Sequence, residues 1–249
     1  MKSGERVRGG ARLKRGEQGE FSFRTWGGKR AGAGRKRRSK ATVPHGRRPK
    51  HSRHHPLHVT LRVVDGLPSL RSKVAFKVVK KALALAKTRA KHREDFRVTH
   101  YSVQGNHVHL VADATDARRV SRGVQGLAIR VARRLNLALG RKGRVFAERY
   151  HSRPLKTPRE VRHALAYVLL NERRHLAKER GLSLPPWYFD PCSSAVEFDG
   201  WRPHVGLPLP PLVKPDVTAP ARTFLLRRLW RRYGLIAPDE VPSGSRKRA

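Results

Sequence analysis

The sequence of 249 residues predicts an α+β protein in which an antiparallel sheet carries its helices on one face. In some segments apolar and polar residues alternate, which is typical of half-buried strands. Between them lie segments whose apolar residues recur every three or four positions, which is typical of amphipathic helices. The length suits one domain of catalytic size with flanking segments. We expect a disordered basic arm over residues 1–54, a folded domain over 55–204 and a C-terminal extension over 205–249.

The first half of the predicted domain contains three strands and one helix. A strand is expected in HPLHVTLRVV, residues 55–64, where apolar residues alternate with polar ones. A helix should run from Ser69 to about His92, because apolar residues recur there at helical steps between lysines and arginines. Two β-rich runs, FRVTHYSV and HVHLVAD, follow and are separated only by residues 104–106, Gln-Gly-Asn. This spacing is typical of a hairpin, so the two strands should pair antiparallel.

A second helix and a fourth strand complete the predicted sheet. Asp116 can cap the helix, whose apolar stripe runs from Val120 to Leu135 and whose end is followed by Gly140. The fourth strand is expected in RVFAERYHSRPL, residues 144–155. The element order is then β-α-β-β-α-β, the ferredoxin-like pattern, with both helices on one face of the sheet. The other face should be open for a ligand.

A further helix is expected directly after the sheet. Residues 157–160, Thr-Pro-Arg-Glu, form a capping box with proline at the first helical position, and the helix should run from about residue 158 to 180. Tyr167 and Asn171 are four residues apart and therefore lie on the same side of this helix. The chain then becomes rich in proline, and a short basic helix is expected between Arg222 and Tyr233.

The formal net charge of +39 indicates a polyanionic partner. Nucleic acid is favoured over a membrane surface, because the Gly-rich, Arg-rich sequence lacks the bulky apolar face of a membrane-binding helix. Residues 1–54 hold 18 Lys and Arg against three Glu, so they should contact phosphates, although a tail that only raises solubility is the alternative. No segment resembles a secretion signal or a membrane span, so we expect a cytoplasmic, nucleoid-associated protein.

The candidate chemistry centres on two histidines of the hairpin. His107 and His109 are two residues apart on a strand, so they face the same way at about 6.6 Å along the chain. Two such imidazoles can chelate a divalent cation if a third ligand comes from a facing element. They could equally be surface histidines in a chain that has 13 of them. Cys192 is the only cysteine, so a cysteine-based zinc site is excluded.

Two segments together resemble the HUH transposases with one catalytic tyrosine, particularly the REP-associated kind. They are Asn106-His107-Val108-His109-Leu110 and Tyr167-Val168-Leu169-Leu170-Asn171, and the resemblance covers roughly residues 55–204. It implies that His107, His109 and Asn171 hold Mg²⁺ or Mn²⁺, and that Tyr167 is the nucleophile. Related members often have proline directly after that asparagine, where this chain has Glu172.

The activity that the resemblance implies is DNA transposition by cleavage and rejoining of single-stranded or hairpin DNA. Attack by a tyrosine would give a 5′-phosphotyrosine and a free 3′-hydroxyl, which conserves bond energy for rejoining. Asn106, Arg149 and Lys156 are candidate DNA contacts, and the number of subunits is left open. The alternative is a protein that binds nucleic acid without catalysis, either a domesticated hairpin binder or an RNA-binding module. An RNA-recognition sheet would need exposed strand aromatics, of which Tyr101 is the main candidate.

Overall fold

The computed structural model describes residues 50–89, 95–203 and 216–242, all of which lie in one compact unit. The predicted basic arm lies outside these residues, apart from its last five positions. The sheet has four antiparallel strands in the order β2-β3-β1-β4. They are β1 (Leu57–Arg62), β2 (Phe96–Val103), β3 (His107–Ala114) and β4 (His151–Pro154). With α1 (Lys73–Arg89) and α2 (Ala117–Ala138) between them, they form the predicted ferredoxin-like pattern.

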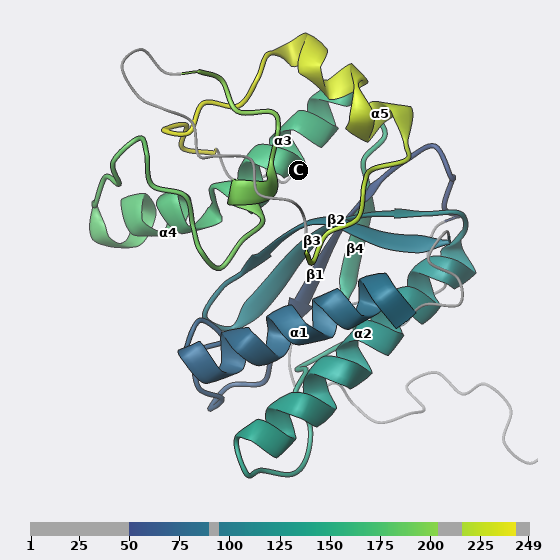
Figure 1. Cartoon of the computed structure of the whole chain (residues 1–249), viewed down its shortest axis with the longest axis vertical. Coiled ribbons are helices and arrows are strands. Elements are labelled where there is room, and N and C mark those ends of the chain that lie inside the picture. The colour runs from purple at the N-terminus through teal and green to yellow at the C-terminus, as the bar shows by residue number, and fades with distance from the viewer. Residues whose placement is uncertain (1–49, 90–94, 204–215, 243–249) are drawn as a thin grey trace, which may run out of the picture. The chain divides into compact units, whose positions relative to one another are not determined.

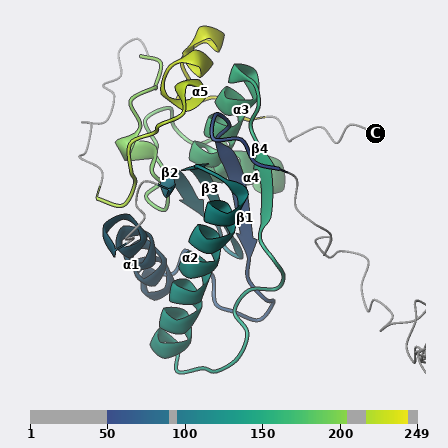
Figure 2. The same ribbon diagram turned by 90° about the vertical axis from the view of Figure 1, so that its right-hand side faces the viewer.

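Helices α1 and α2 lie side by side on one face of the sheet (Figures 1 and 2). The alternate residues of the central strands, including Val59 and Leu110, are buried there against the predicted stripe of α2. Asp116 caps α2 as expected, because its Oδ1 accepts a hydrogen bond of 2.8 Å from the backbone of Arg119. No helix in the described ranges is both long and apolar enough to cross a membrane.

Two predicted boundaries are wrong. Helix α1 begins at Lys73 rather than Ser69, because the segment before it is bonded to the hairpin loop through Leu70 N and Gly105 O, 2.8 Å apart. Its predicted end near His92 falls outside the described residues. The fourth strand is confined to β4, and the residues before it meet the sheet only through an isolated bridge between Val63 and Phe146.

The predicted helix over residues 158–180 is in fact two helices, α3 (Pro158–Leu169) and α4 (Asn171–Arg180). The capping box at the start of α3 is present, with a reciprocal pair of hydrogen bonds between Thr157 and Glu160, each 3.2 Å long. The break falls at Leu170, whose φ and ψ are −108° and 21°. Tyr167 and Asn171 therefore belong to different helices.

The second face of the sheet is not fully open, contrary to expectation. Helix α3 contacts β2 and β3, and residues 216–242 pack against α3. The predicted basic helix is two short pieces, α5 (Phe224–Arg227) and η2 (Leu229–Tyr233). A second core forms between these layers, and its members include Val111, Leu165, Leu169, Trp201 and Trp230.

Polar contacts hold the C-terminal residues on this second layer. Asp113 of β3 accepts hydrogen bonds from the backbone of Arg222 and from both the backbone and the hydroxyl of Thr223. Arg162 of α3 binds Glu240 in a bidentate pair with distances of 3.0 and 2.8 Å. The predicted C-terminal extension is therefore in direct contact with the predicted domain.

Candidate functional site

The candidate site lies on the second face, where β1 and β3 meet the junction of α3 and α4. Strand pairing sets Thr60 of β1 directly opposite His109 of β3, and Arg62 opposite His107. Because side chains alternate along a strand, these residues and His58 all point away from α1 and α2. The alternation that buries apolar residues on the first face of the sheet therefore places polar residues on the second face.

The two histidines of the hairpin lie side by side, with ring centres 4.5 Å apart. Nδ1 of His107 donates a hydrogen bond of 2.7 Å to Oδ1 of Asn106, so Nε2 of this ring keeps its lone pair. Nδ1 of His109 lies 3.1 Å from the hydroxyl of Thr60 and 3.2 Å from Nε2 of His58. Nε2 of His109 is buried and has no hydrogen-bond partner among the described residues.

Tyr167 of α3 lies beside this pair, and Asn171 begins the next helix, α4. The half-buried ring of Tyr167 lies 5.1 Å from the ring of His109 and 5.7 Å from that of His58, measured between centres. Asn171 is completely buried, and neither atom of its amide finds a hydrogen-bond partner within the described chain. A buried amide with both polar atoms unpaired is costly, so it calls for a ligand that the protein itself does not supply.

Burial keeps the histidines of the site neutral. It lowers the pKa of His107 to about 4, with further contributions from His175 and Arg62. Burial likewise lowers the pKa of His58 to about 4, with help from the positive charge of Arg153, and lowers that of His109 well below its usual 6.5. Neutral imidazoles are the form that binds metal ions, so no proton has to be displaced near neutral pH.

The donor set fits a divalent cation. Imidazole nitrogens are ligands for divalent transition-metal ions, and an amide oxygen is the kind of ligand that suits Mg²⁺ and Mn²⁺. Over the described ranges, no group of three or more His, Cys, Asp or Glu side chains is arranged to hold a metal ion. Of the three predicted metal ligands, only His107 and His109 are of these types, because the third, Asn171, is an amide.

Three neighbours of the pair are not among the site residues predicted from the sequence. In the sequence, His58 and Thr60 are only polar positions of a strand, but their register with β3 places both beside His109. His175 lies one turn beyond Asn171, with its ring centre 6.0 Å from that of His107. Its Nδ1 pairs with Glu179 at 2.9 Å, and its buried Nε2 has no partner within the described residues. The four-residue step from Asn171 was the signal that could have identified it.

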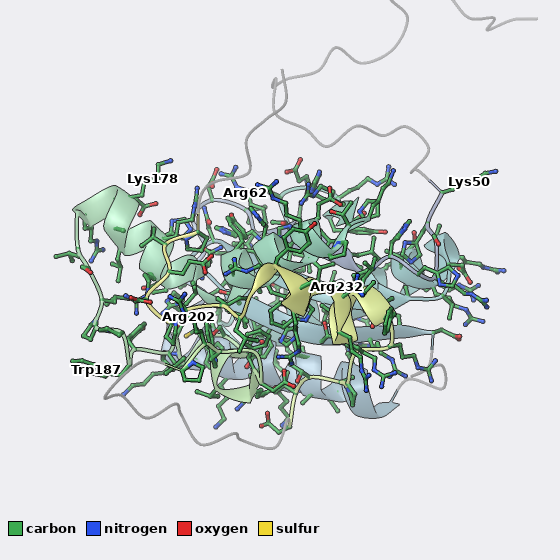
Figure 3. All side chains as sticks on the ribbon, turned by 90° about the horizontal axis from the view of Figure 1, so that it is seen from above. Lys50, Arg62, Lys178, Trp187, Arg202 and Arg232 are labelled. Atoms are coloured by element: carbon green, nitrogen blue, oxygen red, sulfur yellow. The ribbon has the colours of Figure 1, made fainter. Side chains whose placement is uncertain are left out.

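The candidate DNA contacts lie in two places. Asn106 is exposed and is bonded to His107, so it borders the site. Arg149 and Lys156 are exposed before and after β4, and no contact of theirs with the histidine pair is seen in the described residues. Basic side chains such as Arg62, Lys178, Arg202 and Arg232 also project from several sides of the fold (Figure 3). Tyr101, in contrast, is 2% exposed and faces α1 and α2, so it offers no stacking surface.

Comparisons with known proteins gave a match to a family and a match to a solved structure. Residues 60–169 match the model of a family described as "Transposase IS200 like". A solved structure of a REP-associated tyrosine transposase bound to a REP hairpin is 15% identical in sequence, with a TM-score of 0.44 over 61% of this chain and 82% of the other. No curated protein matches significantly. The matched segment contains the histidine pair and Tyr167, and it is similar in sequence to the IS200-like transposase family.

Proposed function

We propose that this protein cuts and rejoins single-stranded or hairpin DNA through Tyr167, as a single-tyrosine transposase of the REP-associated kind. One observation carries the proposal. The centre of the Tyr167 ring lies 5.1 Å from that of His109 and 5.7 Å from that of His58, and the buried amide of Asn171, which has no partner among the described residues, lies at the start of the next helix. A structural tyrosine at the margin of a core would not require unpaired donors around it.

The residues that would hold Mg²⁺ or Mn²⁺ are His107 and His109, through Nε2, and Asn171, through its amide oxygen. Asn106 orients the first ring, because its Oδ1 accepts the hydrogen on Nδ1 of His107. With Nε2 on the metal, Nδ1 of His109 would carry the hydrogen and donate it to Thr60 or His58, which lie 3.1 and 3.2 Å away. When bound, the cation would polarise the phosphate and offset the negative charge that develops on it during attack.

The role of Tyr167 follows from the chemistry of a phosphodiester. Its hydroxyl oxygen would form a bond to phosphorus as the bond from phosphorus to the 3′ oxygen breaks. The product is a 5′-phosphotyrosine, and the departing 3′ oxygen takes up a proton. The guanidinium of Arg174 lies 5.3 Å from the centre of the Tyr167 ring, so a positive charge is available where the phosphate would be held.

The partner supported by the charge of the chain is DNA with unpaired bases. The formal charge of +39 favours phosphate contacts, and basic side chains are exposed around the described fold. The RNA-binding alternative loses support because Tyr101 is buried against the helices. A DNA binder without catalysis remains distinguishable by experiment.

The decisive test replaces Tyr167 with phenylalanine, which removes one oxygen and leaves the ring in place. Wild-type protein incubated with end-labelled hairpin DNA and Mn²⁺ should give a covalent adduct that survives denaturing electrophoresis. Tyr167→Phe should bind the hairpin equally well and give none. Tyr150→Phe is the matched control, because that hydroxyl is engaged 3.2 Å from Ser121. An adduct that persists in Tyr167→Phe, or binding without an adduct in the wild type, would overturn the proposal.

A further inference from the structure

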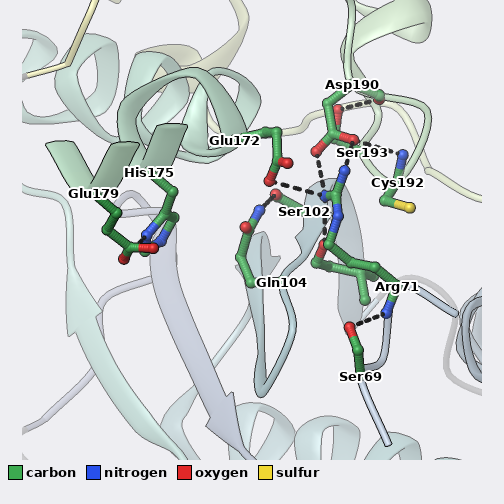
Figure 4. A network of polar contacts seen from close by, with 11 residues as sticks. Ser69, Arg71, Ser102, Gln104, Glu172, His175, Glu179, Asp190, Cys192 and Ser193 are labelled. Carbon is green, nitrogen blue, oxygen red and sulfur yellow. Dashed lines mark hydrogen bonds and ion pairs between the residues drawn. The ribbon is translucent and has the colours of Figure 1, made fainter. Parts of the chain in front are cut away.

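An arginine outside the candidate site joins four segments of the chain (Figure 4). Arg71, which precedes α1, donates two hydrogen bonds to the carboxylate of Asp190, with distances of 3.0 and 2.9 Å. It donates a third, of 3.0 Å, to the carbonyl of Val103 at the end of β2. Its guanidinium also lies 3.4 Å from the carboxylate of Glu172 in α4. We call Arg71, Glu172 and Asp190 the Arg71 clamp.

The clamp acts on the residue next to the predicted metal ligand. Glu172 directly follows Asn171 in α4. Asp190 is itself fixed, because its carboxylate accepts a hydrogen bond of 2.9 Å from the backbone of Cys192. Arg71 therefore connects the first turn of α4 to a carboxylate that is 3% exposed and rigidly held.

The same segment is bonded to the hairpin that carries the histidines. Leu70 donates a backbone hydrogen bond of 2.8 Å to Gly105, and Val63 donates one of 2.9 Å to Asn106. Asn106 in turn orients His107. The residues around Arg71 thus contact both elements that bring the predicted ligands together.

Helix α4 depends on such contacts for its position. It is separated from α3 by the break at Leu170, and only Asn171 and Arg173 of its ten residues are buried. Arg173 is bonded to the carbonyls of Leu184 and Pro185 in the following loop. Toward the sheet, α4 contacts the Arg71 clamp through Glu172 and the ring of His107 through His175. A helix without an apolar face is held by its polar partners rather than by a core.

We propose that Arg71 is a positioning residue that holds α4, through Glu172 and Asp190, so that the amide of Asn171 faces His107 and His109. The inference rests on the proposed function, because it assumes that Asn171 is a ligand. A planar guanidinium that makes two parallel bonds to one carboxylate and contacts a second sets direction as well as distance, which a lysine cannot reproduce.

The test measures Mn²⁺ affinity in the full-length protein, by the EPR signal of free Mn²⁺ during titration. Arg71→Lys and Glu172→Gln should each weaken Mn²⁺ binding by about 10- to 100-fold, the usual effect of losing a partner that orients a ligand. Glu172→Gln keeps the shape of the side chain and is the variant expected to fold without difficulty. Arg162→Gln, which breaks the comparable bidentate pair with Glu240, is the control and should leave Mn²⁺ affinity unchanged.

A double-mutant cycle separates positioning from general loosening. In an Asn171→Ala background, Glu172→Gln should cause no further loss of affinity, because the ligand that the clamp positions is already absent. Wild-type affinity in both Arg71→Lys and Glu172→Gln overturns the clamp, and so does an additive loss in the double variant. If Asn171→Ala and His107→Ala bind Mn²⁺ like the wild type, the proposed metal site itself fails.

Discussion

Replacing Asn171 with leucine should make the metal-free protein more stable while removing its activity. Both polar atoms of this completely buried amide lack a partner among the described residues. An unsatisfied buried polar group costs about 1–3 kcal/mol, which an apolar side chain of similar volume would recover. For a chain of this size, that gain corresponds to a rise in Tm of about 2–12 °C in the presence of chelator.

Mn²⁺ should stabilise the wild type far more than Asn171→Leu. At a free concentration of about 100 times Kd, a ligand that binds only the folded state adds about 2.7 kcal/mol of stability. The wild type should therefore gain Tm on addition of Mn²⁺, and Asn171→Leu should gain little. Differential scanning calorimetry with chelator and with Mn²⁺ measures both values.

A matched asparagine provides the control for this experiment. Asn136 of α2 has both amide atoms bonded, to Gly143 at 2.8 Å and to Arg141 at 3.2 Å. Asn136→Leu should lower Tm, because it removes satisfied hydrogen bonds. If Asn171→Leu lowers Tm in chelator as Asn136→Leu does, the buried amide of Asn171 does not destabilise the metal-free protein. That result would contradict its proposed role as a metal ligand.

Two further predictions concern stability. The folded state holds His58 and His107 at a pKa of about 4, below the usual 6.5, so the unfolded chain binds more protons between these values. Stability in chelator should therefore be fully present above about pH 6.5 and decline as the pH falls toward 4, and a flat profile of Tm against pH over this window would count against the burial of these rings. In the second core, a Cβ at Gly200 would lie 2.4 Å from the Trp230 ring and 2.5 Å from Phe198, so Gly200→Ala should cost about 1–3 kcal/mol in urea unfolding. Gly126→Ala in α2 meets nothing closer than 3.5 Å and should be neutral or stabilising, so equal effects of the two substitutions would show that the ring contacts are not limiting.

The parts of the fold that the sequence predicted correctly are those set by local chemistry. The cap of α2 at Asp116, the capping box of α3 and the hairpin loop all depend on residues within a few positions of one another. The break at Leu170 has no such signal, because leucine is a good helix former and neither glycine nor proline stands there. Helix α4, which follows the break, contacts residues distant in the sequence, such as Arg71 through Glu172.

The candidate site shows the same division. Periodicity placed His107 beside His109, and the structure confirms this. It also predicted that Tyr167 and Asn171 share one side of a single helix, whereas the two residues belong to α3 and α4. The position of His58 follows from the register of β1 with β3, and that of Arg71 from its bond to Asp190, which is 119 residues away. No local sequence pattern predicts either position. The cover on the second face could not be predicted for a similar reason. Trp201 lies in an irregular segment, and the expected short helix that contains Trp230 gives no local sign of where it packs.

The two cores of this protein differ in when their parts leave the ribosome. The core beneath α1 and α2 is built almost wholly from residues 57–145, so sheet and helices can assemble while the rest is still being made. The core around Tyr167 also needs Leu226, Trp230 and Ile236, which are synthesised about 60 to 70 residues after the tyrosine. The half of the molecule that would act on DNA is therefore completed last, after the scaffold that supports it has formed.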